Sequence, residues 1–146
     1  MEIEDAQVEN YDEILFRMNR YLQCNFMTGG QGQMNIMIAS DIHGSAYYCS
    51  KLMEAFEREG ADRLLLLGDL LYHGPRNDLP RDYAPTEVLH MLSEKKQKIF
   101  CVRGNCDTEV DQMVLEFPIL ADYAILEAET RLIYATHGHV FHLQHL

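Results

Sequence analysis

Short apolar runs alternate with helical stretches from Met34 onward, and this alternation limits the folds that the chain can adopt. Each run has the length of a strand, and the runs cover 35–39, 63–67, 98–102, 123–127 and 132–135. Helices are predicted between them over 45–59 and 86–94. This order is typical of an α/β fold with largely parallel pairing in its first half. Only residues 128–131 separate the last two runs, so we expect those runs to form a hairpin.

Composition places the chain among globular proteins with one core. Its 146 residues suit a single core, and 47% hydrophobic with 24% charged residues exclude a wholly disordered chain. No apolar run reaches the roughly 18 residues of a membrane span, and the acidic start at 1–5 is unlike a signal peptide. The four cysteines form no close ligand pair and are interpreted as reduced thiols. A cytoplasmic location is the prediction.

The charge balance narrows the range of partners. Twelve Lys and Arg against 23 Asp and Glu give a formal net charge of −11. The field of such a chain repels nucleic-acid phosphates and anionic lipid surfaces, which argues against a nucleic-acid polymer or a membrane as partner. A small anionic substrate needs bound cations that make its cleft locally positive. The oligomeric state stays open, and a homo-oligomer is compatible with the sequence.

Residues 1–33 form an N-terminal extension whose sequence pattern differs from that of the rest of the chain. Asn10 and Glu13 fit a capping box, and apolar residues then recur at helical spacing, at Tyr11, Ile14, Leu15, Met18, Tyr21 and Leu22. The Gly-rich stretch 28–33 predicts that the helix ends near Gly29 and that a flexible joint precedes a domain at 34–146. Two interpretations stay open: a read-through segment that packs loosely, or a helix that docks or dimerises.

Metal-binding residue types follow four of the predicted strands. Asp41 and His43 follow the first strand, Asp69 the second, Asn105 the third and His137 the last. Because ligands bind beyond the carboxyl ends of the strands in open α/β sheets, these side chains are expected to converge. Each one alone is more often a turn or loop residue. Their joint order, with a glycine near each group to let backbone and ions approach closely, favours a site.

The donor types fit two divalent cations. Carboxylate, imidazole and amide oxygen suit Mn, Fe, Co, Ni or Zn, with Mg also compatible, and manganese is the preferred identity. The lack of convergent thiolates in the sequence argues against a structural zinc cage. Asp69 is placed to bridge both ions, with Asp41 and His43 on one and Asn105 and His137 on the other. Two cations about 3.5–4 Å apart activate a shared water and hold phosphate oxygens, so phosphoester hydrolysis is the predicted chemistry.

These residues, in this order, resemble the calcineurin-like metallophosphoesterases, and most closely the small bacterial YfcE-type phosphodiesterases. The matching stretches are 39–45, 68–77, 83–85, 102–107 and 109–112, and the resemblance runs from Met34 to the last residue. It implies a two-sheet αββα sandwich with a dinuclear site at one rim, and it assigns the five residues above as metal ligands. The activity it implies is hydrolysis of small phosphodiesters by a hydroxide that bridges the two metals.

Two departures from the family pattern bear on the chemistry. The larger superfamily usually has a His after the motif's Asn, whereas this chain has Cys106 and then Asp107 there. A neutral thiol is a poorer acid than imidazolium at neutral pH, so His139 and His73 are candidates for proton transfer and Asp107 for orientation. The family also ends in a Gly-His-x-His motif that this sequence lacks. The domain is therefore predicted to be truncated, with a hairpin edge and part of the core uncovered.

Two arginines and one loop complete the set of candidates. Arg76 and Arg103 are predicted to bind the substrate, although solvated arginines are equally compatible with the pattern. Gly74 and three prolines predict that 74–85 is a rigid loop. This loop either forms one wall of a substrate site or only connects two elements. The alternative to an enzyme is a metallophosphoesterase-like scaffold that binds protein partners and hydrolyses nothing. The sequence leaves the physiological phosphoester undetermined.

Overall fold

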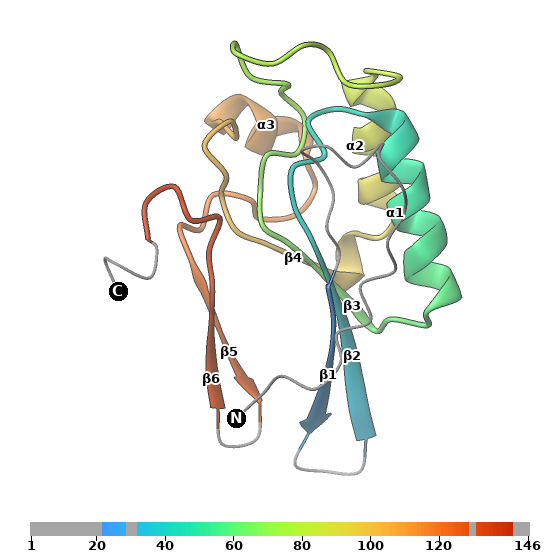
Figure 1. Cartoon of the computed structure of the whole chain (residues 1–146), viewed down its shortest axis with the longest axis vertical. Helices are drawn as coiled ribbons and strands as arrows, with labels where there is room; N and C mark the ends of the chain where they lie inside the picture. Colours follow the sequence, from blue (N-terminus) through green and yellow to red (C-terminus); the bar gives the residue numbers. More distant parts are fainter. Residues whose placement is uncertain (1–21, 29–31, 129–130, 142–146) are drawn as a thin grey trace.

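Three layers make up the described part of the chain in the computed structural model, which covers residues 22–28, 32–128 and 131–141 (Figure 1). Helices cover one face of a four-stranded sheet, and a two-stranded hairpin packs against the other face. Leu64, Leu65 and Leu66 in the middle of this sheet are buried, as expected for parallel strands covered on both faces.

The first sheet has the strand order β1-β2-β3-β4. Its strands are β1 (Leu22–Thr28), β2 (Gly32–Ala39), β3 (Arg63–Leu66) and β4 (Ile99–Cys101). β2, β3 and β4 run parallel, and β1 lies antiparallel beside β2 with Leu22 opposite Ile38. The second sheet is the antiparallel hairpin of β5 (Ala124–Ala128) and β6 (Arg131–Ala135), with Ile125 opposite Tyr134.

Two helices connect the parallel strands. α1 (Ala46–Arg58) begins after Ser45, whose side chain accepts a hydrogen bond from the Tyr48 N–H and so caps the helix. α2 (Pro85–Glu94) has a proline in its first turn, where a missing N–H costs nothing, and the 3-10 helix η1 (Lys96–Lys98) leads from it to β4. α3 (Glu109–Val114) follows β4 and starts with a capping box between Thr108 and Asp111.

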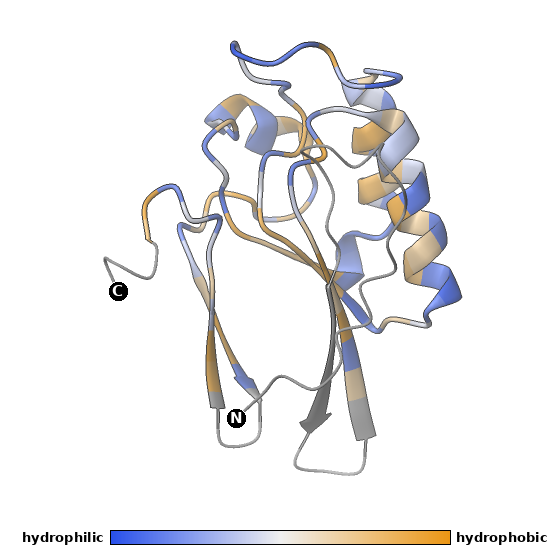
Figure 2. Ribbon diagram, viewed as in Figure 1, coloured by the Kyte–Doolittle hydropathy of each residue, from blue (hydrophilic) through white to orange (hydrophobic). Residues whose placement is uncertain are grey.

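Alternation along the strands separates the two sides of the core. Met37 and Leu64 face the helices, where they pack with Phe56 of α1 and Leu92 of α2. The opposite face is smaller, and its buried residues are Ile36, Leu65 and Ala135. Figure 2 shows apolar residues along β3 and β4 of the first sheet and along the hairpin. Because β2, β3 and β4 run parallel, their carboxyl ends lie at the same edge of the sheet.

The predicted fold class is confirmed. The strands at 35–39, 63–67 and 98–102 pair in parallel as β2, β3 and β4, with bounds that shift by at most a few residues. The helices predicted over 45–59 and 86–94 are α1 and α2. The last two runs form the predicted hairpin. The sequence analysis did not identify α3, a six-residue helix held by its capping box.

The predicted N-terminal helix is wrong over 22–28, and its earlier part lies outside the described residues. Leu22–Thr28 forms β1, and Gly32 and Gln33 belong to β2 rather than to a flexible joint. Asn, Phe, Thr and Cys in 24–28 are weak helix formers, and the free edge of β2 offers them a full ladder of backbone hydrogen bonds. Tertiary pairing therefore outweighs the helical spacing. The domain boundary between 33 and 34 stays a prediction.

The outer face of the hairpin is apolar and accessible. Ile125, Leu132 and Tyr134 are all exposed there, and no element of the described ranges covers them. This agrees with the expectation that part of the core lies uncovered. None of the helices in these described ranges has the length and apolar character needed to cross a bilayer.

Candidate metal centre

The turns after β2 and β3 hold three acidic or imidazole residues in a strained backbone conformation. Asp41, His43 and Asp69 have φ angles of 60°, 48° and 57°. A left-handed conformation at a residue other than glycine costs on the order of 1–3 kcal/mol, and it persists only where the surroundings fix it, most often at functional sites. Here the two turns fix each other, because His43 N–H donates to the Asp69 carbonyl at 2.8 Å.

The carboxylate of Asp69 lies between two imidazoles at the centre of the cluster. Its Oδ2 is 3.5 Å from His43 Nε2 and 3.6 Å from His137 Nε2, and the side chain is buried. Asp41 Oδ1 lies 3.3 Å from His43 Nε2, and Asn105 Oδ1 lies 2.9 Å from His137 Nε2. The structure therefore brings together all five residues that the sequence analysis proposed as ligands. They come from the ends of β2, β3, β4 and β6.

Two overlapping donor groups form within this cluster. One contains Asp41, Asp69 and His137, and the other contains His43, Asp69 and Cys106, with the donor atoms of each group within 4.8 Å of one another. Asp69 belongs to both groups, which is the arrangement expected of a bridging ligand. Asp41 lies near both imidazoles, since its donor atom is grouped with that of His137 and its Oδ1 is 3.3 Å from His43 Nε2, so the predicted partition of the ligands between two ions stays a prediction. Carboxylate and imidazole donors at this spacing suit a divalent transition metal.

Each imidazole is oriented by a backbone carbonyl. His43 Nδ1 donates to the Tyr72 carbonyl and His137 Nδ1 donates to the Leu67 carbonyl, both at 2.7 Å. A carbonyl only accepts, so the ring proton is on Nδ1 and each Nε2 turns a lone pair toward the cluster. His137 Nε2 then faces Asn105 Oδ1, a second acceptor, at 2.9 Å. Two acceptors at that distance repel, and either a proton or a cation between them removes the repulsion, so this pair of residues suits a positive charge.

The electrostatics of the first turn also favour positive charge. Burial alone would raise the pKa of Asp41, but the neighbouring side chains of His43, Ser40 and His137 outweigh it, so this pKa lies below its usual value. Burial alone would lower the pKa of His43, but the carboxylates of Asp41 and Asp69 and the Tyr72 carbonyl raise it above its usual value. Both shifts mean that a positive charge between these groups is stabilised.

Cys106 is a donor that the sequence analysis did not place among the ligands. Its Sγ lies within one of the two donor groups, and its N–H donates to Asp69 Oδ1 at 2.7 Å. Burial, with the negative charge of Asp69, raises the pKa of the thiol to about 11. The thiol is therefore neutral at pH 7, as expected from the sequence. The signal that pointed to its position was its place directly after Asn105.

Asp107 is a buried carboxylate that holds the turn after β3 and the turn after β4 together. Its carboxylate accepts hydrogen bonds from the N–H groups of Asp69, Leu70 and Gly104 at 2.7–2.9 Å, and the residue is buried. Burial raises the pKa of this carboxyl, and the three N–H groups oppose that rise. These bonds join the turn after β3 to the turn after β4. The geometry favours the predicted orienting role over contact with a substrate.

Asp107→Asn is expected to lower the free energy of unfolding by about 2–4 kcal/mol, because an amide leaves buried N–H groups without an acceptor. Urea denaturation of the purified chain measures this change. Asp122→Asn removes an exposed carboxylate and serves as the control, with an expected change of about 0.5 kcal/mol or less. Equal stability of the two variants would contradict a supporting role for Asp107.

The remaining predicted residues lie around the centre with different partners. The His139 ring is 5.2 Å from that of His137, and burial, with His137 and Arg103 nearby, lowers its pKa. His73 packs edge-on against Tyr72 and Tyr83, and its Nδ1 is buried without a hydrogen-bond partner in the described structure. Arg76 is exposed, and Arg103 Nε lies 3.5 Å from Asp122 Oδ1. The roles of these residues stay predictions.

Comparison with known proteins identifies the family. Residues 34–145 match the family profile described as calcineurin-like phosphoesterase. The chain belongs to this family. It is 50% identical over 108 residues to the phosphodiesterase YfcE of Escherichia coli strain K12, and the same figures hold for YfcE of Escherichia coli O157:H7. The matches cover 74% of this chain and 59% of each relative.

The structure agrees with that of a solved phosphoesterase. YfcE, described as a phosphoesterase from E. coli, superimposes with a TM-score of 0.74 at 49% identity, over 76% of this chain and 61% of that chain. The family resemblance and the metallophosphoesterase fold that the motifs implied are thereby confirmed. The chain spans about three fifths of the length of the curated relatives that it matches.

Proposed function

We propose that this chain is a metal-dependent phosphodiesterase that hydrolyses small phosphoesters at the cluster of Asp41, His43, Asp69, Asn105 and His137. The observation that carries the proposal is the position of the Asp69 carboxylate, within 3.6 Å of both His43 Nε2 and His137 Nε2. The phosphodiesterase relatives that match over most of this chain support the activity. We propose that the domain carrying it is 34–146, since the family match begins at residue 34.

The chemistry of the donor set points to two divalent ions, and we propose manganese as their identity. When bound, two such cations lower the pKa of a shared water and bind the non-bridging oxygens of a phosphate. Residues of the chain fix the orientation of the donor side chains. Asp69 faces both donor groups, while the carbonyls of Tyr72 and Leu67 hold His43 and His137 with Nε2 toward the cluster. Rings held in place need no reorganisation when a substrate arrives.

The groups around the cluster suit an anionic ester. A chain with a net charge of −11 repels phosphate, so cations at the cluster and the nearby arginines supply the local attraction. We propose that Arg76 and Arg103 contact the substrate and that His139 or His73 handles the proton of the leaving group. A small phosphoester in the cytoplasm is the proposed substrate, rather than a nucleic-acid polymer or a membrane lipid.

Metal removal and return test the proposed function. The full chain, stripped with a chelator, is titrated with Mn²⁺ by calorimetry, and hydrolysis of bis(p-nitrophenyl) phosphate is followed in parallel. We expect two bound ions per chain, loss of turnover after stripping, and recovery as Mn²⁺ is returned, because the substrate oxygens bind through the ions. A folded chain that takes up no metal and cleaves no ester would favour the alternative of a protein-binding scaffold.

A further inference from the structure

Residues 72–84, here called the rim loop, begin on the metal centre. The Tyr72 carbonyl accepts the hydrogen bond from His43 Nδ1 at 2.7 Å. Gly74 has a φ of 80° and lies against Cys106, because a Cβ at Gly74 would be 3.3 Å from the Cys106 Sγ. Residues 75–79, in the middle of the loop, are exposed and include Arg76. The loop therefore leaves from the cluster and passes over one of its donor groups.

The rim loop ends on the same turn that carries the ligands of β2. Ser45 lies two residues after His43 and is fully buried. Its hydroxyl donates to the Arg81 carbonyl at 2.6 Å, while its oxygen accepts the hydrogen bond that caps α1. Backbone bonds continue this junction, from Ala46 N–H to the Asp82 carbonyl and from Ala84 N–H to the Gly44 carbonyl.

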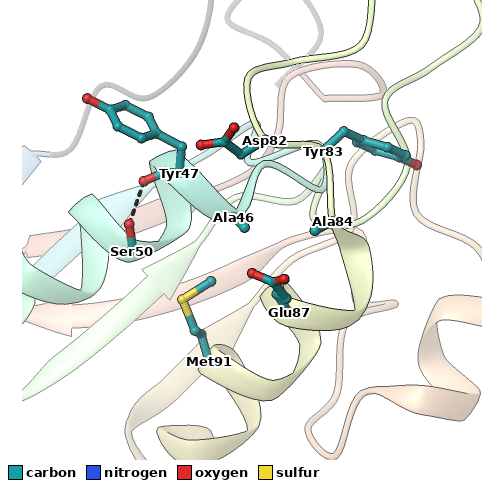
Figure 3. A pocket seen from close by; sticks show the side chains of 8 residues that line it. All are labelled: Ala46, Tyr47, Ser50, Asp82, Tyr83, Ala84, Glu87 and Met91. Carbon is teal, nitrogen blue, oxygen red and sulfur yellow. Dashed lines mark hydrogen bonds between the residues drawn. The ribbon is translucent and has the colours of Figure 1, made fainter.

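Side-chain contacts also hold the end of the rim loop against the start of α1. The guanidinium of Arg81 lies 3.6 Å from the centroid of the Tyr47 ring. Asp82 and Tyr83 line a hollow of about 470 Å³ between the starts of α1 and α2, and Figure 3 shows Tyr47 and Tyr83 at opposite sides of its lining residues. The Tyr83 ring also fills the space beside Gly44, where a Cβ would be 2.5 Å from its Cε2. The end of the loop is thus packed onto the helix that starts beside the metal centre.

We infer that the rim loop positions the substrate of the proposed phosphodiesterase, and that Ser45 is the positioning residue that ties this loop to the metal-binding turn. The inference rests on the proposed function. One short turn, residues 41–45, carries two metal donors and also both anchors of the loop, His43 at its start and Ser45 at its end. A loop fixed at both ends presents Arg76 to the anionic ester at a smaller entropic cost than a free loop.

Limited trypsin digestion tests the anchoring, because Arg76 offers a cleavage site in the middle of the rim loop. In Ser45→Ala we expect cleavage after Arg76 to be about tenfold faster, the factor that corresponds to one lost hydrogen bond when opening precedes cleavage. Ser50→Ala is the matched control on α1, since within the described part of the chain its hydroxyl donates to the Tyr47 carbonyl and to no residue of the rim loop. Its cleavage rate is expected to equal that of the unchanged chain.

Arg81→Gln keeps the proposal testable if Ser45→Ala weakens α1 or fails to fold. The Arg81 side chain is exposed, and the substitution removes the contact with Tyr47 without touching the helix cap. We expect cleavage after Arg76 to be about two- to fivefold faster, as suits an exposed cation–π contact. Unchanged cleavage in both variants, with both folded by circular dichroism, would overturn the anchoring.

Steady-state kinetics with Mn²⁺ and bis(p-nitrophenyl) phosphate test the link to the substrate. In Ser45→Ala and Arg81→Gln we expect KM to rise about three- to tenfold, with kcat and Mn²⁺ affinity within twofold of the unchanged chain, because the loop binds the ester and not the ions. An unchanged KM in variants with faster cleavage would overturn the positioning role. If the unchanged chain hydrolyses nothing, the proposed function fails and the substrate role with it, while the trypsin rates still decide whether Ser45 holds the loop.

Discussion

Asp69→Asn is expected to remove the binding of two ions together and to lower kcat/KM for bis(p-nitrophenyl) phosphate by about 100-fold or more. The carboxylate of Asp69 is the group common to both donor sets. An amide has the same shape but carries no charge, and one of its two ends is an NH₂ group that cannot bind a cation. The Cys106 N–H needs one acceptor, which the amide oxygen still provides. The fold is therefore expected to persist while the bridge is lost.

Asp62→Asn is the matched control for this substitution, because Asp62 and Asp69 lie at opposite ends of β3. Asp62 is exposed, and its Oδ2 accepts a hydrogen bond from the Asn35 N–H at 2.9 Å, which an amide oxygen also accepts. Turnover and Mn²⁺ binding are expected to stay within about twofold. Calorimetry measures Mn²⁺ binding, and steady-state kinetics measures turnover, in both variants. Full turnover in Asp69→Asn, with two ions bound, would refute the assignment of a bridging carboxylate.

The convergence of the five proposed ligands was predictable because it follows from topology. Parallel strands end at one edge of a sheet, so Asp41, Asp69 and Asn105 must lie near one another once β2, β3 and β4 pair. His137 joins them because the hairpin packs on the other face of the same sheet and ends at the same edge. Periodicity and chain order suffice for this much.

Other features depend on contacts that no local pattern encodes. The three N–H groups that surround the Asp107 carboxylate come from two different turns. The position of the Asp41 carboxylate near the imidazoles of both His43 and His137 depends on side-chain direction at left-handed residues. The strand at 22–28 forms because the edge of β2 is available to it. The helical spacing of the apolar residues before 22–28 predicted a helix there, because the sequence does not show that the edge of β2 is free to pair.

Gly104→Ala is expected to disrupt the metal centre more severely than its single methyl group suggests. A Cβ at Gly104 would be 2.1 Å from Asp69 Oδ1 and 2.4 Å from the Asp69 nitrogen. Neither atom is free to move, because the Asp69 N–H is bonded to Asp107 and Oδ1 accepts from the Cys106 N–H. Gly68 closes the other side, since a Cβ there would be 2.1 Å from the Gly104 nitrogen. The turns after β3 and β4 must therefore separate.

Separation of these turns breaks the cluster at its shared ligand. We expect the free energy of unfolding of Gly104→Ala to fall by about 3 kcal/mol and Mn²⁺ binding to be lost, as overpacking against fixed backbone requires. Gly60→Ala is the contrasting control: its φ is 61°, but nothing lies within 4 Å of an added Cβ. Backbone strain alone is expected to cost it about 1–2 kcal/mol and to leave Mn²⁺ binding unchanged. Urea denaturation and calorimetric titration separate the two, and normal metal binding by Gly104→Ala would show that the turns do not need this close contact.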